Sequence, residues 1–462
     1  MPAATALRST SPQQPDDLVA EAPEADAGAV AAAAARARTA QRQWWSLPPA
    51  RRAAALSGAA GELRGRSEEL AALVVREVGK PATEAAGEVA RAVAILDYYA
   101  QLCYLPHGEV LPPSAPGGLL LTQRRPHGLA GLVTPWNFPL AIPLWKAAPA
   151  LAAGNGVLLK PSPEALGCAH ALAEALAHHL PEGLVALVAG GAETGRAVVS
   201  EADVVSFTGS AAVGHAVAAA AAGDATPVQC EMGGHNAAIV LPGADPEATA
   251  QVVTAAAMGY AGQKCTATRR VIVVGEQPEL VEALVEAVGA LRVDDPAGAD
   301  VVVGPVITDA ARRKVMEAVD GAKRAGGRVL TGGAPPDRAG WFVAPTVVDG
   351  VPEDHPVARE ETFGPFTLLQ PVASVEEAVA RCNAVPYGLV TSIHGRDLDQ
   401  LLAVAEGVDT GMVKINGPTA GVDFYAPFGG QKASSYGARE QGIDALRFYS
   451  WSRTVTVAPH LA

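Results

Sequence analysis

The chain has 462 residues, of which 49% are hydrophobic and 18% charged, so it is too long for one core and is expected to form two or three globular domains. Its formal net charge is −13 and it contains no block of Lys or Arg, which argues against binding to nucleic acid or to an anionic membrane. No apolar run reaches the roughly 18 residues that a membrane-spanning helix requires.

The cysteines and the N-terminus bear on the compartment of the protein. Five cysteines are scattered at positions 103, 168, 230, 265 and 382 without CxxC pairing, which argues against a disulfide framework and against a zinc or other metal site. Such a set fits a reducing cytosol, so we expect a cytoplasmic protein. Residues 1 to about 25 are rich in Pro, Ser and Asp and lack an apolar core. We expect a loose leader there and no signal peptide.

The region that follows predicts four consecutive helices. Their expected ranges are 26–45, 49–66, 67–79 and 83–101. Pro49 suits the first turn of the second helix, and Gly79 ends the third. The fourth helix is amphipathic, because Val89, Val93 and Leu96 fall on one face.

A stretch rich in Pro and Gly over 105–126 interrupts this helical pattern. Its strand-like segment is 119–123, and the whole stretch is typical of a protruding arm. The C-terminus also carries an alternating strand, 454–457, which is too isolated to be stable alone. We expect this strand to pair with the arm or with another subunit, and therefore expect a homodimer or homotetramer.

From residue 128 onward strands alternate with helices, which predicts an α/β fold. The first expected strands are 128–134, 156–160, 183–188 and 204–207, and the helices between and after them are 140–151, 164–179, 191–199 and 213–222. Such βαβ units form a parallel, doubly wound sheet that binds ligands at the carboxyl ends of its strands. Strands 237–241 and 270–274 with helices 246–260 and 278–291 predict a second α/β domain, and 335–340 predicts a turn-rich insertion.

Three stretches carry residues suited to covalent chemistry. Cys265 follows a Gly-Gln-Lys turn whose small residue allows close approach of a reactant, although a buried inert thiol is the alternative. Asn137 lies in the proline-bounded segment 134–139 and is either a turn former or a preorganised donor to an oxyanion. Glu231 precedes two glycines and an apolar run. Burial would raise its pKa and suit a general base, whereas a solvated surface Glu is the alternative.

Two strand ends are candidates for binding phosphate or ribose. The segment 207–214 ends a strand with Gly209 and Ser210 and begins a helix, whose exposed N–H groups attract phosphate. It lacks the GxGxxG fingerprint, and an ordinary turn is the alternative. Lys160 closes an earlier strand. In a cofactor crevice it would grip ribose hydroxyls or a phosphate, and otherwise it would only cap the surface.

Six motifs occur in an order and spacing that resemble the aldehyde dehydrogenase superfamily. They are TPWNFP at 134–139, FTGS at 207–210, EMGG at 231–234, GQKC at 262–265, ETFGP at 361–365 and PFGG at 427–430. The resemblance covers about residue 26 to the end. It implies a Rossmann-type cofactor domain over 1–104 and 127–232, an α/β catalytic domain over 233–432, and a β oligomerisation arm over 105–126 and 447–462.

By this resemblance the protein oxidises an aldehyde to the carboxylic acid with NAD or NADP. Cys265 would be the nucleophile that forms a thiohemiacetal and then a thioester. Asn137, with the backbone N–H of Cys265, would hold the oxyanion, and Glu231 would activate the water that hydrolyses the thioester. Lys146 matches a family lysine near the proton path, although a plain helix lysine is the alternative.

The resemblance also implies how the dinucleotide is held. The complete set of cofactor-binding residues it implies is Trp136, Lys160, Ser162, Gly209, Ser210, Glu361 and Phe363. Lys160 would contact the adenosine ribose, Ser210 the pyrophosphate and Glu361 the nicotinamide ribose. The family binds its cofactor without the usual Gly-rich fingerprint, which explains why the sequence lacks one.

Four departures from the family pattern qualify these expectations. Pro163 stands where many NAD-preferring members have a Glu that grips the ribose 2′-OH, so NADP stays open beside NAD. His235 stands where Lys is commoner. Trp451 stands where many relatives carry a Glu that assists the water relay, which predicts that Glu231 acts with less help. The chain also starts late, which predicts that the first strand of the family is missing.

The sequence leaves the identity of the aldehyde open. The residues expected either to line a substrate tunnel or to lie in the core are Phe138, Ile142 and Trp145, with Phe424, Tyr425 and Phe428 on the far side. Arg269 hints at an anionic tail such as a semialdehyde carboxylate, with a structural ion pair as the alternative. The competing functions are a coenzyme A-acylating semialdehyde dehydrogenase, which needs no base such as Glu231, and a non-catalytic binding relative.

Overall fold

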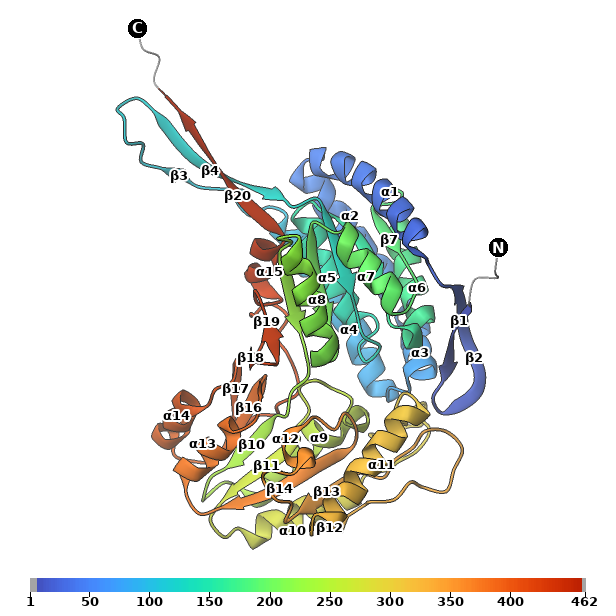
Figure 1. The fold of residues 1–462 in the computed structure, drawn as a ribbon, viewed down its shortest axis with the longest axis vertical. Helices are drawn as coiled ribbons and strands as arrows, with labels where there is room; N and C mark the ends of the chain where they lie inside the picture. Colours follow the sequence, from blue (N-terminus) through green and yellow to red (C-terminus); the bar gives the residue numbers. More distant parts are fainter. Residues whose placement is uncertain (1–5, 459–462) are drawn as a thin grey trace.

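Two mostly parallel sheets, each covered by helices, form the body of the molecule, and a narrow β arm projects from it (Figure 1). The computed structural model describes residues 6–458. The alternation of strands and helices places the chain in the α/β class, as predicted. Among the described residues, no helix combines the length and apolar character needed to cross a membrane.

The first sheet has the strand order β19-β9-β8-β5-β6-β7. Its parallel strands are β5 (Leu129–Val133), β6 (Gly156–Lys160), β7 (Val185–Leu187), β8 (Val204–Thr208) and β9 (Val228–Glu231). The short strand β19 (Ser435–Tyr436) pairs antiparallel with β9 and brings a C-terminal segment to the edge of this sheet. The sequence predicts every parallel strand of this sheet except β9, which has only four residues.

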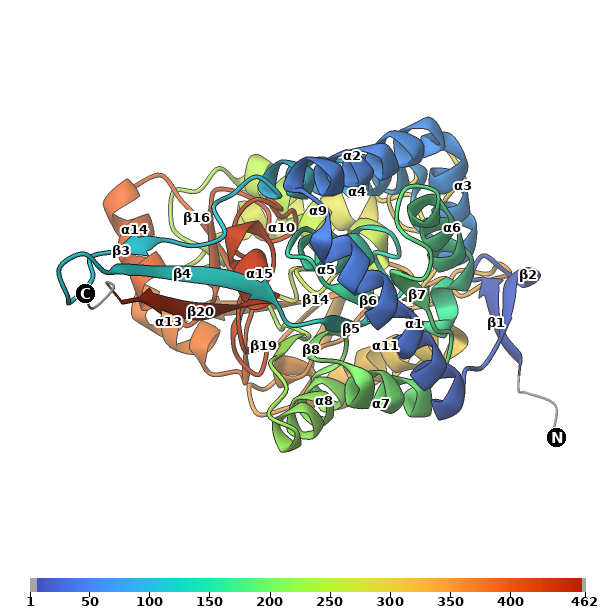
Figure 2. The same ribbon diagram turned by 90° about the horizontal axis from the view of Figure 1, so that it is seen from above.

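Helices cover both faces of the first sheet (Figure 2). One face carries α1 (Ala27–Ser46), α7 (Ala192–Glu201) and α8 (Ala211–Gly223). The other face carries α2 (Pro49–Gly65), α3 (Ser67–Val78), α4 (Ala82–Leu102), α5 (Ala141–Ala152) and the 3-10 turn η1 (Pro163–Ala165) with α6 (Leu166–Ala177). The predicted ends agree within a few residues: Asp26 caps α1, and Gly79 ends α3 with a left-handed φ of 67°.

The second sheet has the strand order β12-β13-β14-β11-β10-β16-β17. Its strands are β10 (Ala237–Val240), β11 (Arg270–Val274), β12 (Arg328–Thr331), β13 (Thr346–Asp349), β14 (Phe366–Val372), β16 (Val390–His394) and β17 (Met412–Ile415), of which β12 is antiparallel. The surrounding helices are α9 (Pro246–Met258), α10 (Pro278–Gly289), α11 (Asp309–Arg324), α12 (Pro356–Arg359), α13 (Val375–Asn383) and α14 (Leu398–Gly407). The strands β15 (Tyr387–Gly388) and β18 (Gln431–Lys432) form a separate pair.

The N-terminal segment is an ordered hairpin, so the predicted loose leader is wrong for residues 6–23. The strands β1 (Ala6–Ser11) and β2 (Gln14–Pro23) pair antiparallel, which also corrects the expectation that a first strand is missing. Ser9 Oγ donates to the buried carboxylate of Glu77 at 2.5 Å, and Asp17 forms an ion pair with Arg76. These contacts with α3 hold the hairpin, although its composition suggests a loop. Residues 1–5 of the predicted leader lie outside the described residues.

The arm consists of three antiparallel strands from two distant parts of the chain. They are β3 (Val110–Leu111), β4 (Leu119–Pro126) and β20 (Ser450–Val457), in the order β20-β4-β3. β20 follows α15 (Gly442–Phe448) and pairs with β4 from Ser450 opposite Pro126 to Val457 opposite Leu119. Of the two predicted partners for the C-terminal strand, the arm is therefore confirmed within this chain. Residues 459–462 of the predicted arm lie outside the described residues.

Candidate active site

Cys265 lies in a tightly turned loop between the two sheets, after α9 and the 3-10 turn η2 (Gly259–Gly262). Tyr260 and Ala261 adopt positive φ values of 55° and 50°, which side chains with a Cβ rarely do. Gly262 is also left-handed, and a Cβ there would lie 2.2 Å from the carbonyl oxygen of Gly364. Such strain persists only where surrounding contacts fix it, and here it leaves Cys265 partly exposed to a cavity.

Hydrogen bonds fix this loop from two sides. Asn137 Nδ2 donates to the carbonyl oxygen of Gln263 at 3.0 Å, so one hydrogen of the buried Asn137 amide is used and the other stays available. Asn236 Nδ2 donates to the carbonyl oxygen of Cys265 itself at 2.7 Å. The loop that carries the thiol is therefore tied to the segment before α5 and to the start of the second sheet.

Arg269 points into the protein and does not line the cavity beside Cys265. Its guanidinium donates to the carbonyl oxygen of Gly364 at 2.6 Å and to that of Gly262, and it lies 5.8 Å from the centre of the Phe363 ring. Burial lowers the pKa of Arg269 to about 10. The hint that Arg269 binds an anionic substrate tail is therefore wrong, because its donors hold the backbone of the loop around Cys265.

Burial dominates the electrostatics of the thiol. It raises the pKa of Cys265 to about 12, and the carboxylates of Glu361, Glu231 and Glu440 raise this pKa further. A thiol with that pKa is almost entirely protonated at neutral pH. Attack by Cys265 on a carbon atom therefore requires a base that removes its proton.

Glu231 is the carboxylate best suited to that role. It ends β9, is 2% exposed, and accepts a hydrogen bond from Ser435 Oγ at 2.5 Å through Oε2. Its Oε1 has no hydrogen-bond partner among the described residues. Burial, followed by the charge of Glu440, raises the pKa of Glu231 well above its usual value. A carboxylate with a raised pKa and a free oxygen is a strong proton acceptor once it is ionised.

A buried lysine lies next to this group, with an acid that the sequence interpretation missed. Lys146 on α5 forms an ion pair with Glu440 and donates to Ser206 Oγ at 2.8 Å. Glu440 is held by backbone hydrogen bonds with Phe428 in both directions. Its segment has no apolar periodicity, and only the fold brings it to Lys146 across 294 positions.

Trp451 does not occupy the place of a relay acid. It lies on β20 in the arm, is 45% exposed, and donates from Nε1 to the carbonyl oxygen of Pro126 at 3.2 Å. The acid close to Glu231 is Glu440, whose charge acts on the pKa of Glu231. The prediction that Glu231 lacks help because of Trp451 is therefore wrong.

The residues predicted to bind the adenosine and pyrophosphate parts of a dinucleotide lie at the carboxyl ends of β6 and β8, where parallel sheets bind ligands. Lys160 ends β6, is buried, and donates to the carbonyl oxygen of Pro161 at 2.9 Å, while Ser162 bonds to Glu164. Gly209 and Ser210 follow β8, and Ser210 is the N-cap of α8 without a side-chain cap bond. The helix start therefore has N–H groups free to meet a phosphate.

The nicotinamide side of the crevice brings the other predicted residues together. Trp136 and Phe363 meet edge to face with ring centres 5.8 Å apart. Burial raises the pKa of Glu361 from 4.5 to about 7, and its Oε1 has no partner among the described residues. A Cβ at Gly233 would lie 2.0 Å from Glu361 Oε2, so the glycine is required for this close approach.

This region has unpartnered polar groups that a bound dinucleotide would satisfy. Thr208 Oγ1 and Glu361 Oε1 are buried acceptors or donors without partners among residues 6–458, and the start of α8 is uncapped. All three features lie at strand ends or in the loop opposite them, where ribose hydroxyls and a pyrophosphate would satisfy them. The GxGxxG turn is not needed, because the helix start supplies the N–H groups.

A cavity of about 240 Å³ lies in front of the thiol, and we call it the Cys265 cavity. Its lining residues are Glu84, Gly87, Glu88, Arg91, Phe138, Ile142, Trp145, Lys264, Cys265, Thr266, Gly421, Val422 and Phe428. Phe138, Ile142, Trp145 and Phe428 therefore line this cavity, which is the first of the two predicted alternatives. Phe424 and Tyr425 do not: Phe424 packs on Tyr98 with ring centres 5.7 Å apart, and Tyr425 is 60% exposed.

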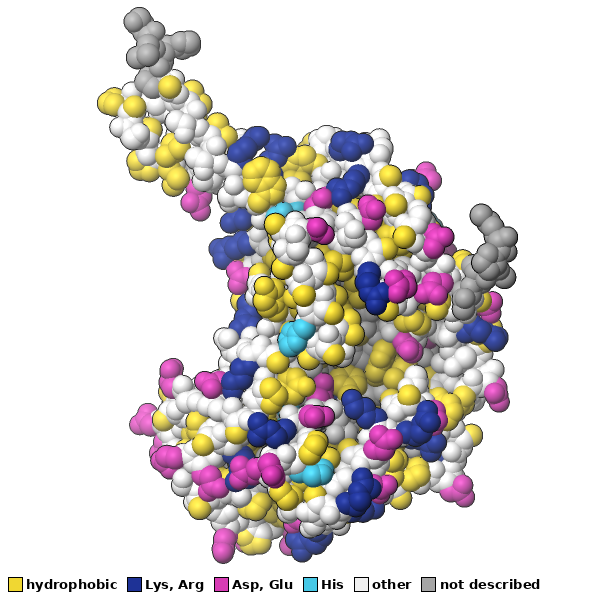
Figure 3. Space-filling model, in the orientation of Figure 1, with side chains coloured by type: hydrophobic (Ala, Val, Ile, Leu, Met, Phe, Trp, Pro, Cys, Tyr) yellow, Lys and Arg dark blue, Asp and Glu magenta, His cyan; other side chains and the backbone are white. Residues whose placement is uncertain are grey.

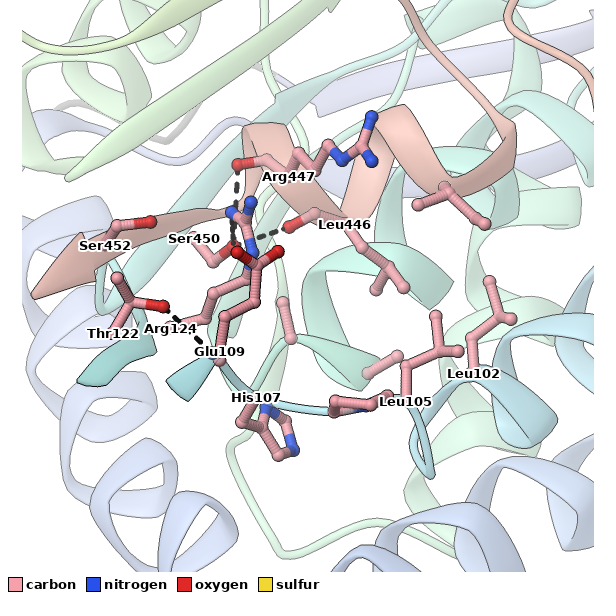
Figure 4. Close-up of a pocket in the computed structure, with 15 residues that line it drawn as sticks. Leu102, Leu105, His107, Glu109, Thr122, Arg124, Leu446, Arg447, Ser450 and Ser452 are labelled. Carbon is pink, nitrogen blue, oxygen red and sulfur yellow. Dashed lines mark hydrogen bonds between the residues drawn. The ribbon is translucent and has the colours of Figure 1, made fainter. Parts of the chain in front are cut away.

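A second hollow, of about 570 Å³, lies at the base of the arm between α15 and the strand pair (Figure 4). Its lining contains none of the six sequence motifs, so it is separate from the Cys265 cavity. On the face drawn in Figure 3, Lys and Arg side chains are interspersed with Asp and Glu. Among the described residues, no group of three or more His, Cys, Asp or Glu is arranged to hold a metal ion.

Comparison with known proteins gives one consistent family. A model described as the aldehyde dehydrogenase family matches residues 2–455. The chain is 38% identical over 458 residues to alpha-ketoglutaric semialdehyde dehydrogenase of Bacillus subtilis, a match that covers 97% of this chain and 94% of that protein. It is 37% identical over 420 residues to 2,5-dioxopentanoate dehydrogenase of Saccharolobus solfataricus, covering 89% and 88%. It is 35% identical over 425 residues to benzaldehyde dehydrogenase (NAD+) of Pseudomonas putida, covering 91% and 87%.

Solved structures agree over the whole fold. PnpE in complex with nicotinamide adenine dinucleotide superposes with a TM-score of 0.95 at 32% identity, covering 99% of this chain and 95% of that chain. An NADP dependent enzyme of E. coli superposes with a TM-score of 0.95 at 31% identity, covering 98% and 95%. The predicted fold class, with its Rossmann-type and catalytic α/β parts and its β arm, is thereby confirmed.

Proposed function

Because the chain belongs to the aldehyde dehydrogenase family, we propose that Cys265, Asn137 and Glu231 carry out its chemistry. The protein oxidises an aldehyde to the carboxylic acid with NAD or NADP, through a cysteine thiohemiacetal and a thioester that is then hydrolysed. The observation that most supports the residue assignment is the bond from the Asn137 amide to the loop of Cys265. This bond supports the assignment because it ties the Asn137 amide to the loop that carries Cys265.

In the first step Cys265 loses its proton and its sulfur forms a bond to the aldehyde carbon. The carbonyl electron pair moves onto oxygen, where the second hydrogen of Asn137 Nδ2 and the backbone N–H of Cys265 would stabilise the negative charge. The proton passes to Glu231, whose raised pKa favours its capture. The thiohemiacetal is thereby held in one orientation, which lowers the entropic part of the barrier.

A bound nicotinamide would supply the hydride acceptor for the oxidation. We propose that Glu361 would bind the neighbouring ribose and that Trp136 and Phe363 would hold the nicotinamide ring. At the other end, Lys160 and Ser162 would contact the adenosine ribose, and Gly209 with Ser210 would contact the pyrophosphate. Pro163 supplies no carboxylate against a 2′-phosphate, so both dinucleotides remain candidates.

Hydrolysis of the thioester needs a base that is free to bind water. Glu231 Oε1 has no partner among the described residues, and the same is true of Glu440 Oε2. We propose that Glu231 takes a proton from water as the hydroxyl attacks the thioester carbon, and that the sulfur of Cys265 leaves. Lys146 and Glu440 would fix this region and pass the proton onward.

The experiment that tests these assignments compares Cys265→Ala with Glu231→Gln. We expect Cys265→Ala to abolish aldehyde-dependent reduction of NAD and NADP, and Glu231→Gln to lower kcat far more than it weakens cofactor binding. Turnover retained by Cys265→Ala would contradict the proposed nucleophile. Equal losses of kcat and of cofactor affinity in Glu231→Gln would contradict the proposed base.

A coenzyme A-acylating enzyme is the alternative within the same fold. Glu231 favours hydrolysis, because transfer of the acyl group to a thiol needs no water-activating carboxylate. Carboxylic acid formed without coenzyme A supports hydrolysis. Turnover that depends on coenzyme A, with no acid in its absence, contradicts it.

We propose that the substrate is a semialdehyde, an aldehyde with a carboxylate at its other end. The Bacillus subtilis and Saccharolobus solfataricus relatives are named for such compounds, and both cover most of this chain. The benzaldehyde dehydrogenase relative is named for a neutral aromatic aldehyde, which is the alternative that the aromatic wall of the Cys265 cavity allows. Kinetics with both kinds of aldehyde, each with NAD and with NADP, separate these possibilities.

We further propose that the arm joins subunits into a homodimer or homotetramer. Its strands expose Val110, Leu119, Trp451 and Val457, which are between 42% and 75% exposed. The hollow beside it has Leu102, Leu105 and Leu446 in its lining, as Figure 4 shows. Burial of these apolar groups in a second copy would stabilise an assembly. Light scattering should give a multimer, and Val457→Glu should weaken it, whereas a monomeric wild type would contradict the proposal.

The division into domains and the compartment are also proposals. Separate hydrophobic cores around the two sheets support a cofactor domain of 1–104 and 127–232 and a catalytic domain of 233–432. The five cysteines are free thiols, which supports a reducing cytoplasm as the site of action. Fractionation of cells tests the compartment, and calorimetric unfolding with one or two transitions tests the division into domains.

A further inference from the structure

One wall of the Cys265 cavity is a single face of α4. The residues it contributes are Glu84, Gly87, Glu88 and Arg91, which are spaced by three, four and seven positions from the first. Residues at these spacings lie on the same side of an α-helix. The apolar part of the lining consists of Phe138, Ile142, Trp145 and Phe428. A molecule in this cavity would therefore contact both apolar side chains and a helix face that carries charges.

The charges on this helix face are paired, with one exception. Glu84 forms an ion pair with Lys264 at 2.7 Å. Glu88 forms a fully buried ion pair with Lys80. Arg91 is half-buried and has no ion pair or hydrogen-bonding side chain within reach among residues 6–458. The wall therefore carries one unbalanced positive charge, and that charge lies at the Arg91 guanidinium.

Gly87 leaves room beside that charge. A Cβ at this position would meet no heavy atom within 4 Å, so the glycine is not required by packing. Glycine in the middle of a helix costs about 1 kcal/mol relative to alanine, which makes its presence here unfavourable for α4 alone. An open glycine one turn before Arg91 enlarges the cavity on the approach to the guanidinium.

We propose that Arg91 binds the remote carboxylate of the substrate and makes the enzyme selective for short ω-oxo carboxylates. This inference rests on the proposed function of Cys265 as the nucleophile. The planar guanidinium donates two parallel hydrogen bonds to a carboxylate, and the partial burial of Arg91 strengthens that pairing. The cavity of about 240 Å³ is smaller than the usual 300–1,000 Å³ of sites for drug-sized ligands. The carbon chain between aldehyde and carboxylate is therefore short.

The pairing also explains how a neutral aldehyde is disfavoured. An aldehyde of the same length without a carboxylate would bury part of the Arg91 guanidinium with no partner. Discrimination of this kind rejects analogues that lack the recognised polar group more strongly than those that differ by a methylene. The apolar lining contacts the carbon chain of the substrate, and Arg91 selects substrates whose carbon chain ends in a carboxylate.

The test compares glutarate semialdehyde with pentanal, which has the same number of carbon atoms and no carboxylate. For Arg91→Ala we expect kcat/KM for glutarate semialdehyde to fall by about ten- to one-hundred-fold, with pentanal unchanged or improved. Arg91→Lys should recover part of the loss. The matched control is Arg64→Ala, because Arg64 forms an exposed pair with Asp97 away from the cavity.

A binding measurement separates recognition from catalysis. Glutarate, the dicarboxylate product, should protect Cys265 from alkylation in the wild type and in Arg64→Ala, and should fail to protect it in Arg91→Ala. Equal losses for both aldehydes, an unchanged ratio between them, or unaltered protection by glutarate would overturn the role of Arg91. Failure of the wild type to oxidise either aldehyde would instead overturn the proposed function.

Discussion

Two buried lysine–glutamate pairs hold α5, and their glutamates use their oxygens differently. Glu88 pairs with Lys80, and its Oε1 accepts the N–H groups of Leu140 and Ala141 at 2.9 and 3.0 Å. Glu440 pairs with Lys146 and accepts from Ser206 Oγ at 3.2 Å through the same Oε1. Its Oε2 has no partner among the described residues.

The difference distinguishes a structural pair from a reactive one. Glu88 has both oxygens bonded, and the N–H groups it accepts belong to the start of α5, directly after the segment of Asn137. Glu88 therefore holds the segment next to Asn137, which we propose as the oxyanion donor. Glu440 keeps an unsatisfied oxygen in a buried site, which costs free energy unless water or a proton uses it. This oxygen lies near Glu231, which we propose as the base for hydrolysis of the thioester.

The largest expected effect comes from breaking the structural pair. Glu88→Ala leaves Lys80 buried without its partner and frees two backbone N–H groups, so we expect the free energy of unfolding to fall by about 3–5 kcal/mol. Chemical denaturation measures this. The matched control replaces both partners, Lys80→Met with Glu88→Leu, and should recover part of the loss. If Glu88→Ala were as stable as the wild type, the pair of Lys80 and Glu88 would not be structural.

The second effect concerns Glu361, a buried carboxylate with no lysine partner. Burial raises its pKa from 4.5 to about 7, so the folded state keeps this proton to higher pH than the unfolded state. The contribution of protonated Glu361 to the free energy of unfolding is therefore present in full below pH 4.5. It is lost as the pH rises through about 7, and the loss is at most about 3 kcal/mol.

Glu361→Gln removes that titration. We expect the variant to gain stability over the wild type at pH 8, to show no such gain at pH 4, and to bind the cofactor more weakly because the ribose loses a carboxylate. Denaturation at the two pH values and calorimetric titration with NAD measure the two effects. A pH-independent difference in stability would contradict the assigned titration.

The third effect tests the reactive pair. Glu440→Gln keeps the shape of the side chain and removes the negative charge that raises the pKa of Glu231. The pKa of Glu231 should fall, so the acid limb of the kcat profile should move to lower pH. We also expect kcat to drop by about ten- to one-hundred-fold, because the proton path loses a member. An unmoved limb would mean that Glu440 is only structural, like Glu88.

The smallest expected effect comes from the helix that carries Glu88. Gly87→Ala adds a methyl group where nothing lies within 4 Å and improves the helix propensity of α4, so stability should rise by up to about 1 kcal/mol. The pair between Lys80 and Glu88 is untouched, which separates the effect of the pair from that of the helix. A loss of stability above that size would show that the site is packed, contrary to the geometry.

The sequence predicted the body of the fold because its signals are local. Composition, the Pro and Gly end signals and, for α4, apolar periodicity predicted the helices α1 to α4, and the alternation of apolar runs with helical segments predicted β5, β6, β8, β10 and β11. The N-terminal hairpin was missed because its stability comes from α3, through Ser9 and Glu77 and through Asp17 and Arg76. Its own composition suggests a loop, and no local pattern records those distant partners.

The site residues also divide into those that local motifs predict and those that only the folded chain reveals. Motifs placed Cys265, Asn137 and Glu231 in order, and the structure brings the loops that carry them together. Glu440 carries no local signal, because its partner Lys146 lies 294 positions away. The direction of Arg269 depends on two carbonyl groups that only the folded loop brings within reach. Long-range contacts of this kind decide which charged residues face the substrate.

The most direct test of the central claim is to trap the acyl group on Cys265. Glu231→Gln should form the thioester in a single turnover and hydrolyse it slowly, so intact-mass spectrometry should detect one acyl group, and peptide mapping should place it on Cys265. The double variant Cys265→Ala with Glu231→Gln should carry none. A Glu231→Gln enzyme that turns over slowly without any adduct, or with the adduct on another residue, would contradict the proposed roles of Cys265 and Glu231.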